Sequence, residues 1–176
     1  NSRDRMPIIS LLGYTNAGKS TLFNRLTKLN VNAADKLFET LDTKVSIIYL
    51  AAGRKAFISD TVGFISDLPT LLVEAFKSTL EEIKQSDLLI HVRDCCATDS
   101  EQQKIDVLEV LKQLNIYPNS EEGPPMIEVM NKLDTAPKSL NENIKEINNL
   151  VFISAKTGIG IENLKENIKN ILWKQN

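Results

Sequence analysis

The chain has 176 residues, which is enough for one α/β domain with a sizeable core. Its 21 basic and 23 acidic residues give a net charge of −2, which excludes a general basic surface for nucleic acid. No apolar run approaches the roughly 20 residues that span a membrane. The first residue is Asn rather than Met, and we therefore expect a fragment of a longer protein.

The first predicted elements are a strand over residues 7–12 and a helix over residues 19–28, joined by a glycine-rich loop. The loop, residues 13–20, reads G-Y-T-N-A-G-K-S and fits G-x-x-x-x-G-K-[ST] between the strand and the helix that this motif requires. Gly13 and Gly18 allow the backbone to turn, so that successive N–H groups point at one anion. The helix adds its positive dipole end. The pattern predicts a nucleoside triphosphate site.

Each side chain of this loop has an expected contact with the nucleotide. Lys19 brings a positive charge to the β- and γ-phosphates, and the hydroxyl of Ser20 can bind Mg²⁺. The residues expected to bind the phosphates are Asn16, Ala17, Gly18, Lys19, Ser20 and Thr21.

The next segment, residues 31–43, is predicted to be a switch loop, followed by a hairpin with strands over 45–50 and 54–60. Thr40 is the first candidate in the loop to bind Mg²⁺ and sense the γ-phosphate, and Thr43 is the alternative. The second strand ends at Asp60, whose carboxylate can hold Mg²⁺ through water. In the run D-T-V-G, Gly63 would place a backbone N–H near the γ-phosphate.

The rest of the chain alternates between helices and strands, which implies a mostly parallel sheet. We expect a P-loop NTPase fold of the small G-protein kind, with six strands, one antiparallel edge strand and helices on both faces. The motifs then lie at the carboxyl ends of strands, where open α/β sheets bind ligands. The remaining helices are expected over 70–85, 101–114, a short stretch after Pro137 and 161–174, and the strands over 87–94, 126–131 and 150–154.

The run N-K-L-D at residues 131–134 indicates which base is bound. Guanine presents two donors on one edge, and the carboxylate of Asp134 can accept both, whereas adenine would present an unpaired acceptor there. Asn131 can bond N7 of the base, and the stem of Lys132 can cover its face. These residues predict a preference for guanine.

The run S-A-K after the last strand completes an ordered set of four segments. Backbone N–H groups of this loop would donate to O6 of guanine, and its residues are Ser154, Ala155 and Lys156. The triplet is a weak signal alone. In this order, the four segments predict a small GTP-binding domain with Mg²⁺ and GTP or GDP as ligands.

Two other features are interpreted as structural. Cys95 and Cys96 follow the strand over 87–94. Neighbouring strand residues point to opposite faces, and neither disulfide nor metal-site spacing is present, so we expect two isolated thiols in a reduced compartment. The only histidine, His91, is interpreted as a packed residue with its polar atoms satisfied, and Trp173 as a helix packing residue.

Four segments resemble the HflX family of translational GTPases, and together they cover the G domain, which is nearly all of the chain. They are G-Y-T-N-A-G-K-S-T-L-F-N at 13–24, L-F-E-T-L-D at 37–42, D-T-V-G-F-I-S-D-L-P at 60–69 and L-V-E-A-F-K-S-T-L-E-E at 72–82. Era-like, EngA-like and Obg-like proteins usually lack the F-I-x-D-L-P run that continues the third of these segments. One departure is L-D-T-K at 41–44, without the family's Pro and nearby Arg, which leaves the conformation of that loop open.

The resemblance implies a further domain before the G domain, with residues 1–6 as the linker and residues 1–176 as one GTP-binding domain. It implies a cytoplasmic GTPase that acts as a switch on the large ribosomal subunit and separates stalled or stressed ribosomes. Ribosome contacts would lie mostly in regions outside this chain. No membrane partner is expected, and we expect the G domain to be monomeric.

Slow basal hydrolysis is expected because Phe64 follows the D-x-x-G glycine, where many GTPases place a Gln that orients water. Asn16 resembles the Asn of cation-dependent GTPases that holds K⁺ against the phosphates. The alternative, that Asn16 only favours the loop's turn, stays open. The residues expected to take part in catalysis are Lys19, Thr40, Gly63 and Asn16.

Two further classes of function stay open. One is a GTPase for ribosome assembly or RNA modification, like the Era, EngA and TrmE proteins, and the run at 64–82 argues against it. The other is a GTP-binding scaffold with slow turnover, and the presence of Lys19, Ser20 and Asp60 argues against that. An ATPase or a small-molecule kinase is disfavoured by the run at 131–134.

Overall fold

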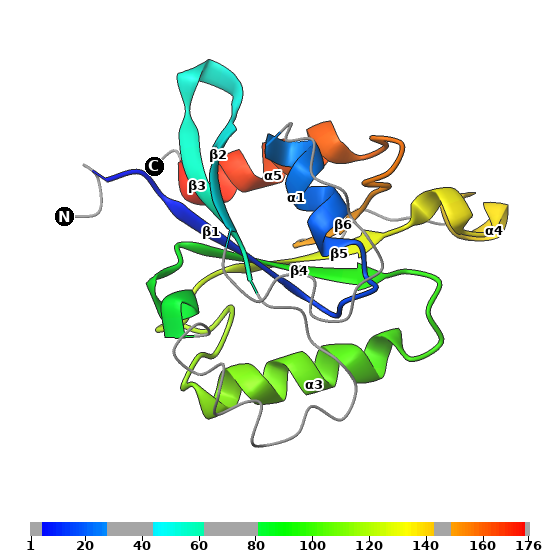
Figure 1. The fold of residues 1–176 in the computed structure, drawn as a ribbon, viewed down its shortest axis with the longest axis horizontal. Helices are drawn as coiled ribbons and strands as arrows, with labels where there is room; N and C mark the ends of the chain where they lie inside the picture. Colours follow the sequence, from blue (N-terminus) through cyan, green and yellow to red (C-terminus); the bar gives the residue numbers. More distant parts are fainter. Residues whose placement is uncertain (1–4, 28–43, 62–80, 143–148, 175–176) are drawn as a thin grey trace.

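The computed structural model describes residues 5–27, 44–61, 81–142 and 149–174, which form a central sheet between two layers of helices (Figure 1). The six strands lie side by side in the order β2-β3-β1-β4-β5-β6. Their bounds are β1 (Ile8–Gly13), β2 (Lys44–Tyr49), β3 (Lys55–Asp60), β4 (Leu88–Asp94), β5 (Met126–Asn131) and β6 (Leu150–Phe152).

Four of the five strand pairs are parallel, and only the edge strand β2 runs antiparallel to its neighbour β3. The central strands are buried on both faces, as parallel strands covered by helices are. In β4 every residue except the last is buried. The predicted fold class is therefore confirmed, including the antiparallel edge strand.

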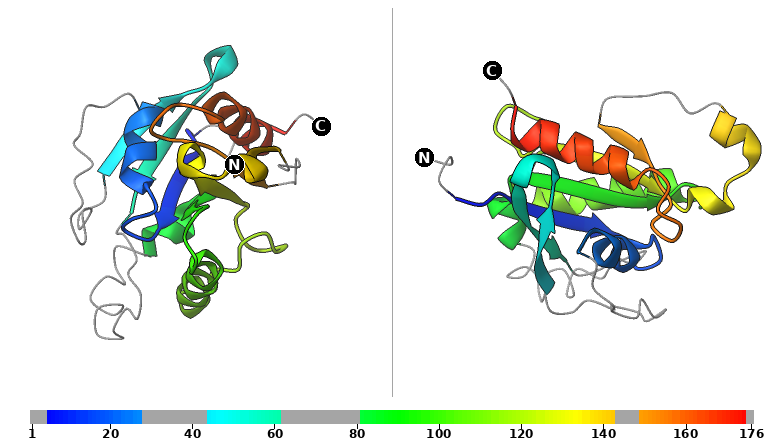
Figure 2. Two further views of the ribbon diagram at one scale, coloured as in Figure 1. Left: turned by 90° about the vertical axis from the view of Figure 1, so that its right-hand side faces the viewer. Right: turned by 90° about the horizontal axis from the view of Figure 1, so that it is seen from above.

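Helices cover both faces of this sheet: Figure 2 shows α3 (Ser100–Gln113) on one side and α1 (Lys19–Thr27) with α5 (Ile161–Leu172) on the other. A short α4 (Lys138–Glu142) follows β5, and 3₁₀ turns form at Ala51–Gly53, Glu82–Gln85 and Leu133–Thr135. The longest described helix, α3, has 14 residues. Within the described ranges no helix is both long and apolar enough to cross a membrane.

Two apolar cores hold the layers together, one on each face of the sheet. Burial of a Leu, Ile or Phe side chain contributes about 1.5–3 kcal/mol, so these cores fix the strands whose ends carry polar residues. The helix residues of the first core are Leu22, Phe23 and Leu26 of α1 and Ile161, Leu164 and Ile168 of α5. The second core packs Val107 and Leu111 of α3 against Leu12, Leu89 and Met126.

Most element bounds agree with the sequence prediction to within two residues. The strand predicted over 126–131 is confirmed at both ends, and the helix predicted over 19–28 is confirmed as far as Thr27, beyond which its last residue lies outside the described residues. The strand predicted over 150–154 ends at Phe152, because the chain then turns into a loop. Most of the helix predicted over 70–85 lies outside the described residues, and its described end is the 3₁₀ turn Glu82–Gln85.

Candidate nucleotide-binding site

The carboxyl ends of the parallel strands lie at one end of the sheet, and in Figure 1 β1, β4 and β5 run toward the right of the view. The loop after β1 begins at Gly13, β3 ends at Asp60, and β5 ends at Asn131. Because parallel strands all point the same way, segments far apart in the sequence meet here. The four predicted nucleotide-binding segments are therefore brought to one place, as far as the described residues include them.

Glycine is required at two positions of the loop between β1 and α1, the P-loop. Gly18 has φ +93°, and a Cβ there would lie 2.2 Å from Nδ2 of Asn131. A Cβ on Gly13 would lie 2.6 Å from the carbonyl oxygen of Val92 on the neighbouring strand. Any larger residue would displace the P-loop from the adjacent strand end or from the loop after β5.

Lys19, the first residue of α1, is buried with the groups expected to meet the phosphates and the metal ion. Its ammonium forms an ion pair with the carboxylate of Asp60 and donates to the carbonyl oxygen of Thr61. Lys19 is 3% exposed and Asp60 0% exposed, so little water screens this pair. The strand end of β3 and the start of α1 are thereby held together by charge.

Ser20 and Asp60 present two oxygen atoms that fit a hard cation. The Ser20 hydroxyl donates to Oδ2 of Asp60 over 3.3 Å. Two oxygens that both bind an octahedral Mg²⁺ directly, with bonds of 2.0–2.1 Å, lie about 2.9 Å apart, which is close to this separation, so Asp60 is near enough to Ser20 to bind the ion directly as well as through water. Hydroxyl and carboxylate oxygens are also the ligand types that Mg²⁺ selects. The described residues therefore fit the predicted metal site.

Asn131, at the end of β5, joins the P-loop to the loop after β6. Its Nδ2 donates to the carbonyl oxygen of Ala17 over 2.9 Å, and its Oδ1 accepts from the N–H of Ala155 over 2.9 Å. The side chain is only 3% exposed. Sequence reasoning expected Asn131 to bond N7 of the base. In the structure this side chain joins the two loops, and its bond to N7 stays a prediction.

Lys132 and Asp134 lie in the loop of residues 131–135, which we call the base-recognition loop, on the outer side of the contacts made by Asn131. Lys132 takes a left-handed backbone conformation with φ +69°, and its Nζ donates to the carbonyl oxygen of Asn16 over 2.6 Å. Nζ also lies 3.3 Å from the carboxylate of Asp94. Its aliphatic stem therefore extends from the β5 end toward the P-loop, which is where a base would lie. Strained backbone of this kind is often found at ligand sites.

Asp134 is oriented from the other side by the loop after β6. Its Oδ1 accepts a hydrogen bond from the Ser154 hydroxyl over 2.8 Å, and that hydroxyl accepts from the N–H of Thr157 over 3.1 Å. Asp134 is exposed, whereas Ser154 is 0% exposed. A buried serine thus holds one oxygen of an accessible carboxylate.

Arg25 is a residue of this site that sequence reasoning missed. Arg25 extends from α1, and its Nε donates to the carbonyl oxygen of Ala155 over 3.0 Å. Its Nη2 donates to the carbonyl oxygen of Lys156 over 2.5 Å. Because its partners are backbone atoms, no residue type elsewhere in the sequence indicates the contact. The guanidinium fixes the loop whose N–H groups are expected to meet O6 of the base.

Replacing Arg25 by Ala is expected to weaken GDP binding about tenfold, because one or two hydrogen bonds worth about 1 kcal/mol each no longer order the Ala155–Lys156 loop. Fluorescence titration with a labelled GDP measures the change. Arg54→Ala is the matched control, since Arg54 stacks on Trp173 with its guanidinium carbon 5.1 Å from the ring centre, away from the P-loop. Equal affinities for both variants would contradict this role.

Outside the site, the side chains of Cys95, Cys96 and His91 differ in part from the sequence prediction. Cys95 and Cys96 do not point apart, because they follow the end of β4, and their sulfur atoms lie 3.6 Å apart. Burial, aided by the neighbouring Cys96 and Asp94, raises the pKa of the Cys95 thiol to about 12. His91 is buried as expected. However, only its Nδ1 has a partner, Glu128 at 3.2 Å, and its Nε2 has none among the described residues.

Two opposing effects act on the pKa of the Glu128 carboxyl. Burial alone would raise its pKa, but the hydrogen bond and charge of His91, with the charges of Lys104 and Arg93, lower the pKa overall. Arg93 is itself held by Glu101 and is 4% exposed. Its guanidinium is committed to this cluster rather than directed at the phosphates.

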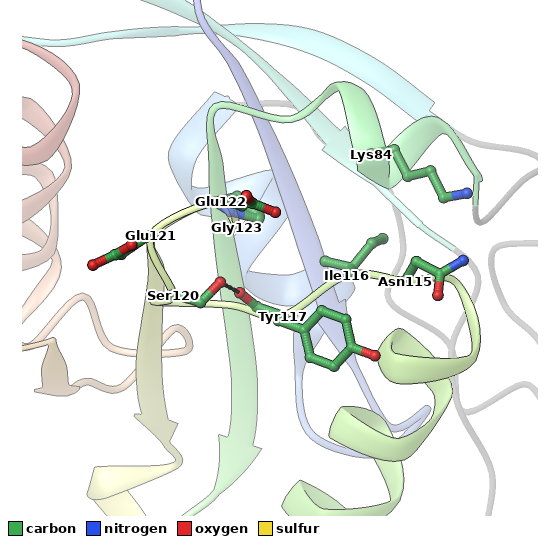
Figure 3. Close-up of a pocket in the computed structure, with 9 residues that line it drawn as sticks. Lys84, Asn115, Ile116, Tyr117, Ser120, Glu121, Glu122 and Gly123 are labelled. Carbon is green, nitrogen blue, oxygen red and sulfur yellow. Dashed lines mark hydrogen bonds between the residues drawn. The ribbon is translucent and has the colours of Figure 1, made fainter.

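A hollow of about 810 Å³ lies at the amino ends of the parallel strands, around the loop between α3 and β5 (Figure 3). It is lined by Lys84, Tyr117 and the acidic turn at Glu121 and Glu122. The Ser120 hydroxyl donates to the carbonyl oxygen of Tyr117 over 2.6 Å and closes this turn. Because the hollow lies at the amino end of β5, it is separate from the nucleotide site.

The family of the chain follows from a comparison with known families. A family profile described as "50S ribosome-binding GTPase" matches residues 8–132. The chain belongs to this GTPase family. The matched region begins at the first residue of β1 and ends at Lys132, so it contains the P-loop, Asp60 and Asn131.

Relatives of the family narrow this assignment. The chain is 43% identical over 173 residues to the GTPase HflX of Lacrimispora saccharolytica, covering 98% of this chain and 40% of that protein. It is 43% identical over 162 residues to the GTPase HflX of Escherichia coli, covering 90% of this chain and 37% of that protein. These matches confirm the HflX resemblance. The chain spans about 40% of the length of the curated relatives it matches.

A solved structure supports the same fold. The chain is similar to a GTP-binding protein from the hyperthermophilic archaeon Sulfolobus solfataricus in complex with GDP. The TM-score is 0.71 at 30% sequence identity, and the match covers 94% of this chain and 52% of that chain. The P-loop GTPase fold is thereby confirmed for this member of the GTPase family.

The γ-phosphate side of this G domain stays a prediction. Thr40 and its alternative Thr43, as well as Gly63 and Phe64, lie outside the described residues. The described residues include the P-loop, Asp60 and the run at 131–134, whereas the residues expected to contact the γ-phosphate lie outside them.

Proposed function

We propose that this chain binds GTP with Mg²⁺, hydrolyses it slowly to GDP, and serves as the cytoplasmic G domain of an HflX-type switch on the large ribosomal subunit. One observation carries the guanine assignment. Asn131 joins the P-loop to the loop after β6, and Ser154 orients the accessible carboxylate of Asp134 beside them. A carboxylate held there can accept both donors of guanine, and adenine offers no such pair.

In this proposal the P-loop and the end of β3 handle the phosphates. Backbone N–H groups of residues 16–21 bind phosphate oxygens, and the Lys19 ammonium moves from Asp60 to the β- and γ-phosphates. Ser20 and Asp60 would hold Mg²⁺, which would neutralise charge on the phosphates. Thr40 and Gly63 are proposed to contact the γ-phosphate from the switch segments. The loop Ser154–Lys156 donates its N–H groups to O6 of the base.

Potassium dependence is proposed for the hydrolysis step, through the side chain of Asn16. The residue is exposed in the P-loop, with its backbone carbonyl bound by Lys132. Its amide oxygen could hold K⁺ against the phosphates and supply positive charge that no described arginine supplies. The alternative role, support of the turn alone, requires no cation.

Asn16→Ala is expected to abolish any acceleration of GTP hydrolysis by K⁺ over Na⁺ at equal ionic strength. Single-turnover phosphate release measures both rates. The matched control is Asn163→Ala, which changes an exposed asparagine on α5. Stimulation that survives in Asn16→Ala, or a wild-type rate equal in both salts, would reject the cation role and leave turn geometry as the function of Asn16.

The ribosomal partner is proposed from the family description and the HflX relatives. The test is co-sedimentation of the longer protein that contains this chain with mature large subunits, in a non-hydrolysable GTP analogue and in GDP. Binding in the analogue that is lost in GDP supports a switch. Recovery of assembly intermediates in place of mature subunits would favour an assembly factor, and no nucleotide dependence would favour a scaffold.

A further inference from the structure

A group of three potential metal ligands lies just beyond the carboxyl end of β4. The strand ends with Asp94, and Cys95 and Cys96 follow it directly. One oxygen of the carboxylate and the two sulfur atoms all lie within 4.8 Å of one another. Both cysteines are free thiols. Within the ranges that the structure describes, this is the one group of three His, Cys, Asp or Glu side chains at such distances.

The sulfur separation matches the geometry of a tetrahedral thiolate site. Two thiolates on one Zn²⁺, each at about 2.3 Å and at the tetrahedral angle, lie about 3.8 Å apart. The Sγ atoms of Cys95 and Cys96 are 3.6 Å apart. Only a small adjustment would therefore bring both onto one ion. Zn²⁺ also accepts carboxylate oxygen, and a water molecule commonly fills the fourth position.

The surrounding backbone holds these ligands in place before any ion binds. The N–H of Cys95 donates to the carbonyl oxygen of Asn131 over 2.9 Å, and the N–H of Cys96 donates to Oδ1 of Asp94 over 2.9 Å. The Thr135 hydroxyl lies 3.5 Å from Sγ of Cys96 and also bonds the carbonyl oxygen of Lys132 over 2.8 Å. Partners of this kind orient metal ligands. Cys96 is exposed, so an ion has a path from solvent.

The carboxylate of Asp94 has capacity for a further partner. It already accepts from Cys96 and lies 3.3 Å from Nζ of Lys132. A carboxylate offers about four lone-pair sites, so an ion can be added while at least one of these contacts remains. A cation between the three groups also removes the mutual repulsion that they would have when all are ionised.

We propose that Cys95, Cys96 and Asp94 form a binding site for one thiophilic divalent cation of the zinc class. Both thiols lose their protons on binding, so two protons are released to solvent and no oxidant is required. The site lies beside the base-recognition loop through Asn131 and Thr135, and is separate from the Mg²⁺ ligands Ser20 and Asp60. It uses two soft sulfur ligands, whereas the Mg²⁺ site uses oxygen alone.

The test is titration of the reduced, metal-free chain with Zn²⁺ against a chromophoric chelator, with Cd²⁺ as a spectroscopic probe. We expect one Zn²⁺ per chain, and an ultraviolet thiolate-to-metal charge-transfer band with Cd²⁺. Cys95→Ser and Cys96→Ser are expected to lower Zn²⁺ affinity more than the roughly 10- to 100-fold typical of residues that only orient ligands. Asp94→Asn is expected to lower it at least about tenfold.

Thr98→Ala is the matched control, because Thr98 is an exposed neighbour without a ligand atom in the group, and its affinity is expected to be that of the parent chain. Circular dichroism establishes that each variant is folded before titration. Full affinity in either cysteine variant or in Asp94→Asn would overturn the proposal. A stoichiometry well below one, or the absence of the Cd²⁺ band in the reduced chain, would also overturn it.

Discussion

Asp134→Asn is expected to lower GTP affinity about 100-fold and to raise affinity for xanthosine triphosphate. The carboxylate is expected to accept two hydrogen bonds from guanine, each worth about 1.5 kcal/mol or more because one partner is charged. An amide replaces one accepting oxygen with a donor, which faces the donors of guanine but suits the 2-oxo group of xanthine. Ser154 can still bond the remaining oxygen, so the loop itself is expected to stay in place.

The measurement is competition of GTP, XTP and ATP against a labelled guanine nucleotide. Asp99→Asn makes the same change of charge at an exposed residue that precedes α3 and caps it with no side-chain hydrogen bond. That control is expected to bind GTP as the parent chain does. If Asp134→Asn retained full GTP preference, or if the parent chain bound ATP equally well, Asp134 would not be the residue that selects the base.

Lys19→Met is expected to slow single-turnover GTP hydrolysis by about 10²–10³-fold, the size of effect seen when one preorganised electrostatic group is removed. Met preserves much of the side-chain volume but carries no charge to the phosphates. A second effect is expected on folding. Asp60 is 0% exposed and would lose its ammonium partner, and breaking a buried ion pair in this way costs about 3–5 kcal/mol.

Two further variants separate catalysis from folding. Lys19→Arg retains a positive charge near Asp60, so it is expected to recover thermal stability while hydrolysis remains impaired, because its planar group does not reproduce the point charge of an ammonium. Lys112→Met removes an exposed lysine from α3 and is expected to change neither quantity. Hydrolysis at the parent rate in folded Lys19→Met would contradict the proposed role of the P-loop lysine.

The fold could be predicted closely because its signals are local and repeated. The strand over 126–131 was placed at both ends, since an apolar run leads directly into a polar loop. The order of strands and helices predicted the parallel sheet. The strand expected to reach Ser154 ends at Phe152, because the chain turns and the Ser154 N–H donates to the carbonyl oxygen of Ile159 within the following loop. That bond joins two backbone groups, so no residue type in the sequence indicates it.

The motif residues of the site could also be predicted, but their partners could not. The run at 131–134 predicts Asn131 as a base contact, which stays a prediction, and the structure adds its hydrogen bonds to Ala17 and Ala155. Arg25 was missed because it bonds backbone oxygens, which every residue has. The rule that neighbouring strand residues point to opposite faces predicts that the side chains of Cys95 and Cys96 point apart. It failed there because the pair lies beyond the end of β4, where strand alternation no longer applies.

Single-turnover phosphate release by this chain with Mg²⁺, with GTP and ATP as parallel substrates at the same concentration, tests the guanine site and the hydrolysis together. We expect slow, Mg²⁺-dependent release of phosphate from GTP and no release from ATP. Equal release from both nucleotides would contradict the guanine site at Asp134. Binding of GTP without any release of phosphate would contradict the claim that this G domain is a GTPase on its own.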